Sequence, residues 1–230
     1  MVVELHLLEE VYALNKVRLK YEKKSDVKYI GHLDTITMFD RAFRRSGIDI
    51  KFSNGFNKRA CFVFALPTGA GIESKCEYME FEVLDESLDL NLIKECLNKV
   101  LPNGFNILDI SLINDKKSIM AKVIESEYCI NIYLKESIDE IYNTILEIFA
   151  KDEVLVVKKS KDDEIKWINI KDNILNIEIN QIEDKIQIIL KSKAGSNSNL
   201  RPEYIVQAIE NENIEVLDYE IIRTNLILDE

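Results

Sequence analysis

The chain has 230 residues, 47% of them hydrophobic, which is enough for one large domain or two small ones with a full core. Its apolar runs are far shorter than the roughly 18 residues of a membrane span, and its acidic start, MVVELHLLEE, lacks the basic residues of a signal peptide. From these absences we expect a cytoplasmic protein with no membrane contact. The net charge of −11 argues against general coating of nucleic acid.

Residues 16–115 are predicted to form a first half after an N-terminal extension, 1–15. VRLKYEKK (17–24) alternates apolar and polar residues as a half-buried strand does. Residues 31–47 have helical spacing, with Asp34 in the first turn and Gly47 as the C-cap. Further strands are expected at 48–52, 60–66, 77–84 and 106–113, and a helix at 89–101. The order β-α-β-β-α-β is that of a ferredoxin-like sandwich.

After a connector, 116–123, residues 124–230 are predicted to form a second half with the same order of strands and helices. Helices are expected at 137–151 and 202–211, and strands at 128–134, 153–159, 165–170, 174–179, 185–190 and 215–228. The predicted fold class is therefore α+β, with two ferredoxin-like halves and antiparallel sheets.

The charges are distributed unevenly along the chain. Residues 16–72 contain twelve Lys or Arg against five Asp or Glu, a surplus of seven positive charges on an acidic protein. This distribution is typical of a protein in which one face meets an anion, although a merely solvated basic face is the alternative.

Two glycine-bearing bends flank the apolar run 60–66. In the first, SNGFN, the candidate binding residues are Ser53, Gly55, Phe56, Asn57, Lys58 and Arg59. The second bend, PTGAG, contains Gly69 and Gly71, whose small size would let backbone amides approach a ligand. The alternative is that these glycines only form ordinary turns around a hairpin. Phe56 would either stack on a base or fold back onto the sheet.

The predicted first helix carries the other candidates. His32 is a possible acid–base group with Asp34 beside it, and the alternative is that both only shape the start of the helix. Asp40 is expected to pair with Arg44 four residues on, which leaves Arg41 and Arg45 for an anion. With two histidines and four scattered cysteines, the sequence predicts no metal site.

The segments YIGHLDTITMFDRAFRRSGI, SNGFN and ALPTGAGIESKCEYMEFEVL resemble, in this order, the radical-SAM-associated protein family, a domain of unknown function. The resemblance is clearest over residues 17–113, and LRPEYIVQAI and IIRTNLIL are compatible with it. The matching family positions are His32, Asp34, Arg41, Ala42, Arg45, Ser53, Gly55, Phe56, Asn57, Pro67 and Gly69. Relatives commonly continue the GFN turn with Pro-His-Pro, where this chain has Lys58, Arg59 and Ala60.

Members of that family stand alone or are fused behind a radical SAM and cobalamin-binding protein, so the resemblance implies a radical SAM partner. This chain has no CxxxCxxC motif for an iron–sulfur cluster, and we expect no cofactor. The favoured hypothesis is a non-catalytic accessory protein that binds RNA or another polyanionic substrate for this partner. The alternatives are an RNA-processing or RNA-modifying enzyme that uses His32 and Asp34, and a structural docking scaffold without nucleic acid.

Overall fold

The computed structural model describes residues 15–84, 89–159 and 164–229, so residues 1–14 of the predicted extension lie outside the described residues. The first half contains β1 (Asn15–Lys23), α1 (His32–Ser46), β2 (Val63–Phe64), β3 (Glu73–Val83), α2 (Leu90–Val100) and β4 (Phe105–Leu112), and a 3₁₀ turn, η1 (Ser25–Tyr29), follows β1. Gly47 ends α1 in the left-handed conformation with φ of 72°, which confirms the predicted C-cap.

A short helix, α3 (Ile119–Lys122), leads into the second half. Its elements are β5 (Val123–Leu134), α4 (Ile138–Ala150), β6 (Leu155–Lys159), β7 (Ile165–Asn169), β8 (Ile174–Ile182), β9 (Lys185–Lys193), α5 (Glu203–Glu210) and β10 (Val216–Leu228). β6 and β7 pair with each other in a separate two-stranded sheet, inserted between α4 and β8.

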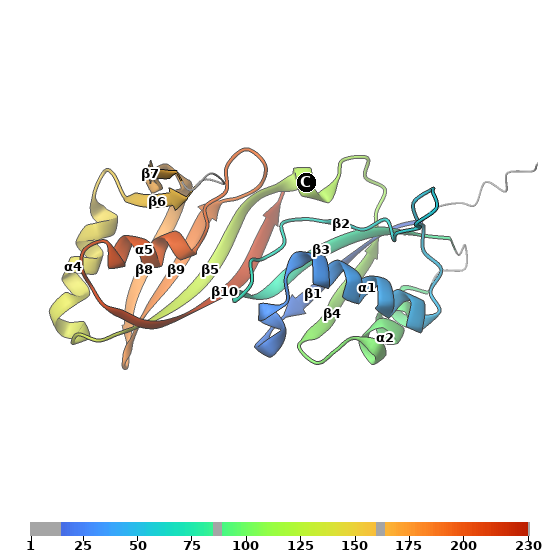
Figure 1. Ribbon diagram of the computed structural model, residues 1–230, viewed down its shortest axis with the longest axis horizontal. Helices are drawn as coiled ribbons and strands as arrows, with labels where there is room; N and C mark the ends of the chain where they lie inside the picture. Colours follow the sequence, from blue (N-terminus) through green and yellow to red (C-terminus); the bar gives the residue numbers. More distant parts are fainter. Residues whose placement is uncertain (1–14, 85–88, 160–163, 230) are drawn as a thin grey trace, which may run out of the picture.

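The two halves share one eight-stranded sheet in the described part of the chain, with the order β4-β1-β3-β10-β5-β9-β8 and β2 beside β3. Each half has the same internal strand order, β4-β1-β3-β2 in the first and β10-β5-β9-β8 in the second, so both are ferredoxin-like and the predicted α+β class is confirmed. Figure 1 shows α1 and α2 over the first half of the sheet, and α4 and α5 over the second.

One junction in this sheet is parallel. Ile222 and Arg223 of β10 lie opposite Glu73 and Ser74 of β3, whereas the other paired strands run antiparallel. We call this junction the seam, because the halves meet there within the sheet.

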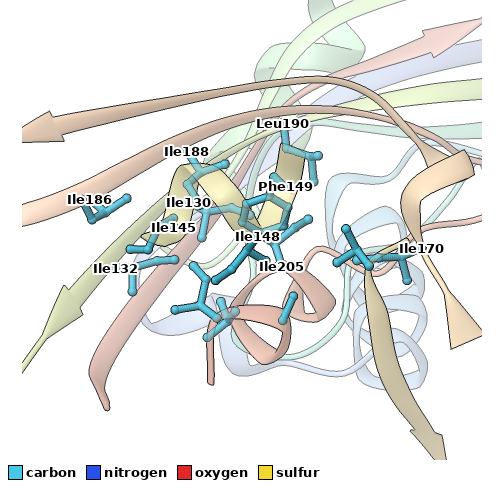
Figure 2. Packing of buried hydrophobic residues seen from close by; sticks show 14 of the residues in the cluster. Ile130, Ile132, Ile145, Ile148, Phe149, Ile170, Ile186, Ile188, Leu190 and Ile205 are labelled. Atoms are coloured by element: carbon cyan, nitrogen blue, oxygen red, sulfur yellow. The ribbon is translucent and has the colours of Figure 1, made fainter. Parts of the chain in front are cut away.

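Each half has its own hydrophobic core beneath its helices. In the second half, isoleucines of β5 and β9 such as Ile130 and Ile188 pack against Ile145 and Ile148 of α4 (Figure 2). In the first half, Phe39 and Phe43 of α1 pack on β1 and β3. Over the described residues, no helix is long and apolar enough to cross a membrane.

The predicted strands at 48–52 and 60–66 are wrong in extent. Only Val63 and Phe64 form β2, and segment 48–52 makes isolated bridges at Ile50 and Phe52. β2 pairs with β3 at Glu80 and Met79, while β10 takes the same edge of β3 at residues 73–74. Continued in the register of β2, residues 60–62 would lie opposite 81–83 of β3, but Ile50 already bridges Val83 and the Lys51 amide donates to the Glu82 carbonyl. Residues 60–61 pair with 51–52 instead, and the sequence of 60–66 does not indicate this competition.

Candidate functional site

His32 is the first residue of α1, and its ring packs edge-on against Phe64 with 5.0 Å between ring centroids. His32 is an exposed residue, but the partial burial of its ring lowers its pKa below the usual value; the Glu77 carboxylate opposes this shift, and the Lys23 ammonium adds to it. The imidazole is therefore neutral at neutral pH. Asp34 is exposed in the same turn and, among the described residues, forms no hydrogen bond with His32, so the two do not form an oriented acid–base pair.

Many cations of the basic segment 16–72 are neutralised by acids. Lys16 and Arg18 both bind the buried Glu80 at 2.7 Å, and Lys51 binds Glu82. Arg44 binds Asp40 at 2.9 Å, which confirms the predicted i,i+4 pair. Two further pairs, Lys24 with Glu22 and Lys28 with Glu73, complete the set found for this segment in the described ranges.

The four cations predicted to hold an anion are outside this set. Within the described part of the chain, Arg41, Arg45, Lys58 and Arg59 have no carboxylate within 4.0 Å. Arg45 is partly engaged, because its Nη2 donates a hydrogen bond of 3.0 Å to the carbonyl of Val100 at the end of α2. The structure thus leaves these charges uncompensated but spreads them over both flanks of α1.

The turn 53–59 is closed by two hydrogen bonds between its ends. The amide of Ser53 donates to the carbonyl of Arg59 at 2.8 Å, and the amide of Arg59 donates to Ser53 Oγ at 3.0 Å. Gly55 has φ of 134°, a conformation that favours glycine. Phe56, at the tip, is fully exposed, so it does not fold back onto the sheet.

Lys58 and Arg59 line a shallow groove of about 400 Å³ along α1. Its lining also includes the apolar Leu33, Ile36 and Ala60, and Asp40. Because Arg44 already binds Asp40, the uncompensated charge of the groove is positive. Arg41 follows Asp40 on the exposed side of α1. We use the name α1 groove for the residues that line this groove together with Phe56 and Asn57 of the adjoining turn; Arg41 is not among them.

Gly69 and Gly71 do not belong to the α1 groove. Gly69 lines a separate cavity of about 360 Å³ at the seam, which we call the seam cavity. Gly71 has φ of 90° and donates its amide to the carbonyl of Lys28 at 2.9 Å, so its role is to hold the turn against η1. The predicted site residues are thus divided between two places.

A buried ionic network lies at the bottom of the seam cavity. Arg223 is 1% exposed; its Nη2 binds Glu77, its Nη1 donates to the carbonyl of Leu66 at 2.5 Å, and its Nε donates to Ser74 Oγ at 3.4 Å. Burial disfavours its charge, but Glu77 outweighs this effect and raises the pKa of Arg223, so the guanidinium stays charged. Burial raises the pKa of the neighbouring Tyr128, whose hydroxyl stays neutral.

Sequence reasoning missed the seam cavity apart from Gly69. Its other walls come from segment 199–203, with Arg201 and Glu203, and from Thr68, Tyr128 and Arg223. The available signal was Arg223, an arginine at a core-facing position two residues after Ile221 in the segment IIRTNLIL. Such a residue needs a buried acid, but nothing in the sequence indicates which one.

The fold and these two sites define a class of α+β protein with paired ferredoxin-like halves, a basic surface groove and a polar cavity at the seam. The chain belongs to a family described as an uncharacterized protein conserved in bacteria (DUF2344), whose model matches residues 16–202. No curated protein matches this chain.

Among solved structures, a chain of "Crystal Structure of a Cbf5-Nop10-Gar1 Complex" is similar with a TM-score of 0.50 and 9% identity over 91% of this chain. Our chain spans 48% of that chain, and the likeness concerns the fold alone. An unknown protein from Galdieria sulphuraria has a TM-score of 0.27 and 14% identity, with 94% of this chain and 99% of that chain covered.

Proposed function

We propose that the protein is a cytoplasmic accessory module that binds single-stranded RNA in the α1 groove and presents it to a radical SAM partner. One observation carries the proposal: Lys58 and Arg59 lack acidic partners in the described chain, and they follow a fully exposed aromatic residue, Phe56, in the same turn. Cations that track phosphates together with a ring on which a base can stack are the usual elements of sequence-tolerant RNA binding.

The acidic character of the rest of the molecule is consistent with RNA binding at one surface only. The net charge is −11, so RNA is repelled from most of the surface and retained only where positive charge is uncompensated. Arg41, on the exposed side of α1, extends the positive surface beyond the groove. Ser53 and Gly55 contribute indirectly, because they hold the turn that presents Phe56.

The test is fluorescence anisotropy with labelled oligouridine and oligoadenine over a range of salt concentrations. We expect the double variant Lys58→Gln/Arg59→Gln to bind more weakly and to lower the salt dependence by about 0.7 for each lost phosphate contact. Phe56→Ala should weaken binding by about 1–3 kcal/mol with little change in salt dependence. The control with matched charge is Lys166→Gln/Lys193→Gln, because both lysines are exposed and lie outside the α1 groove.

Equal RNA affinity of the groove variant and its control would refute RNA binding in the groove. The exposed Leu33 and Phe56 favour a second function, docking of a protein. In that case Phe56→Ala would abolish co-purification of a co-expressed radical SAM partner, while the protein would bind neither oligonucleotide.

A further inference from the structure

The seam cavity differs from the α1 groove because both halves of the chain build it. The first half contributes the turn around Thr68 and Gly69, and the second contributes segment 199–203 and Arg223. Its volume of about 360 Å³ is at the lower end of the range for small-molecule sites.

Thr68 gives the first indication of a ligand. The residue is only 8% exposed, and its hydroxyl oxygen is buried without a hydrogen-bond partner in the described chain. A buried hydroxyl without a partner is costly, and proteins usually avoid it. Because Thr68 lines the cavity, a polar atom of a ligand placed there would be its partner.

The charges at the walls give the second indication. Arg201 and Glu203 both line the cavity, and in the described ranges neither makes an ion pair or a side-chain hydrogen bond, not even with the other. Glu203 Oε1 would lie 3.8 Å from a Cβ placed on Gly69, so this carboxylate stands against the glycine turn. One cavity therefore presents one uncompensated positive and one uncompensated negative charge.

The floor adds no further net charge. Arg223 is neutralised by its bond to Glu77 and is held by Ser74 and the Leu66 carbonyl. Arg201 and Glu203 are thus the residues that would bind the charged groups of a ligand. A phosphate would be repelled by Glu203 and a simple cation by Arg201, whereas a molecule with both charges would satisfy both residues.

We propose that the seam cavity binds a small zwitterion of the α-amino acid type. Arg201 holds the carboxylate, Glu203 holds the ammonium group, and the Thr68 hydroxyl donates a hydrogen bond to a ligand oxygen. Bound ligand would bridge the two halves, since its partners belong to both. This site is independent of RNA binding in the α1 groove.

The experiment measures thermal shifts of the full chain with each standard L-amino acid in turn, followed by calorimetric titration of those that stabilise it. The probes that separate the two charges are the N-acetyl and carboxamide derivatives of each binder. We expect both derivatives, and both Arg201→Gln and Glu203→Gln, to bind about tenfold more weakly or worse. Matched controls are Lys166→Gln and Glu153→Gln, which are exposed and lie outside the cavity.

Thr68→Val distinguishes a ligand contact from a structural role. Because the hydroxyl has no protein partner, this variant should keep or raise the unfolding temperature of the free protein while lowering amino-acid affinity. The inference is overturned if no amino acid binds, if the blocked derivatives bind as well as the parent, or if inorganic phosphate binds instead. Lys58→Gln/Arg59→Gln should bind amino acids normally, so failure of the RNA proposal would leave this result unaffected.

Discussion

Arg223 of β10 binds Glu77 of β3 at the seam, and both side chains are almost completely buried. The partners are 146 residues apart and belong to different halves of the chain. The pair therefore joins the two ferredoxin-like halves by a charge interaction, next to the parallel strand pairing at residues 73–74 and 222–223.

Breaking this pair on one side should strongly destabilise the protein. Glu77→Gln leaves the guanidinium of Arg223 buried without its counter-charge, which costs about 3–5 kcal/mol. The measurement is the free energy of unfolding in urea. In the double variant Glu77→Gln/Arg223→Met the loss should be smaller than for Glu77→Gln alone, since no unpaired charge remains. A double variant less stable than Glu77→Gln would contradict this account.

Local spacing and long-range pairing explain which features the sequence could predict. The Asp40–Arg44 pair follows from helix geometry four residues apart, and the structure has it. The partner of Arg223 follows from the meeting of β3 and β10, which no local pattern encodes. The shortness of β2 has the same origin, because Ile50 and Lys51, and not residues 60–62, take the edge of β3 beside Val83. Likewise, the sequence singles out Gly69 as a flexible turn residue. It does not indicate that Arg201 and Glu203, from the other half, line the same cavity.

Two glycines offer a comparison of steric and conformational cost. A Cβ on Gly195 would lie 2.2 Å from the carbonyl oxygen of Val123, whereas a Cβ on Gly47 would meet nothing within 4 Å. Both have positive φ, 107° and 72°. We therefore expect Gly47→Ala to cost about 1 kcal/mol in free energy of unfolding, and Gly195→Ala to cost clearly more because backbone must move. Equal losses in urea denaturation would refute the close contact.

The depressed pKa of His32 predicts a dependence of stability on pH. Partial burial favours the neutral imidazole in the folded protein, so the unfolded chain binds more protons once the pH falls below the ordinary histidine pKa of about 6.5. The contribution of His32 is therefore complete above that pH and decreases as the pH falls toward the folded-state pKa. Comparing urea unfolding of the wild type and His32→Gln at several pH values isolates this effect from that of other groups.

An NMR titration of the His32 ring gives the direct measurement. The expected midpoint lies below that of histidine in a model peptide. A midpoint above the model value would mean that Glu77 dominates over burial, and the stability difference would then change with pH in the opposite direction.

Phe56 and Phe43 provide the last contrast, between a ring kept at the surface and a ring that the fold needs. Phe43 is 1% exposed and packs edge-on against Phe81 with 4.8 Å between centroids, whereas Phe56 makes no ring contact in the described structure. Phe43→Ala should cost about 3–5 kcal/mol in free energy of unfolding. Phe56→Ala should change it by no more than about 0.5 kcal/mol. If Phe56→Ala destabilised the protein as Phe43→Ala does, the ring would be part of the core, and it would not be available to stack on a base or to dock a partner.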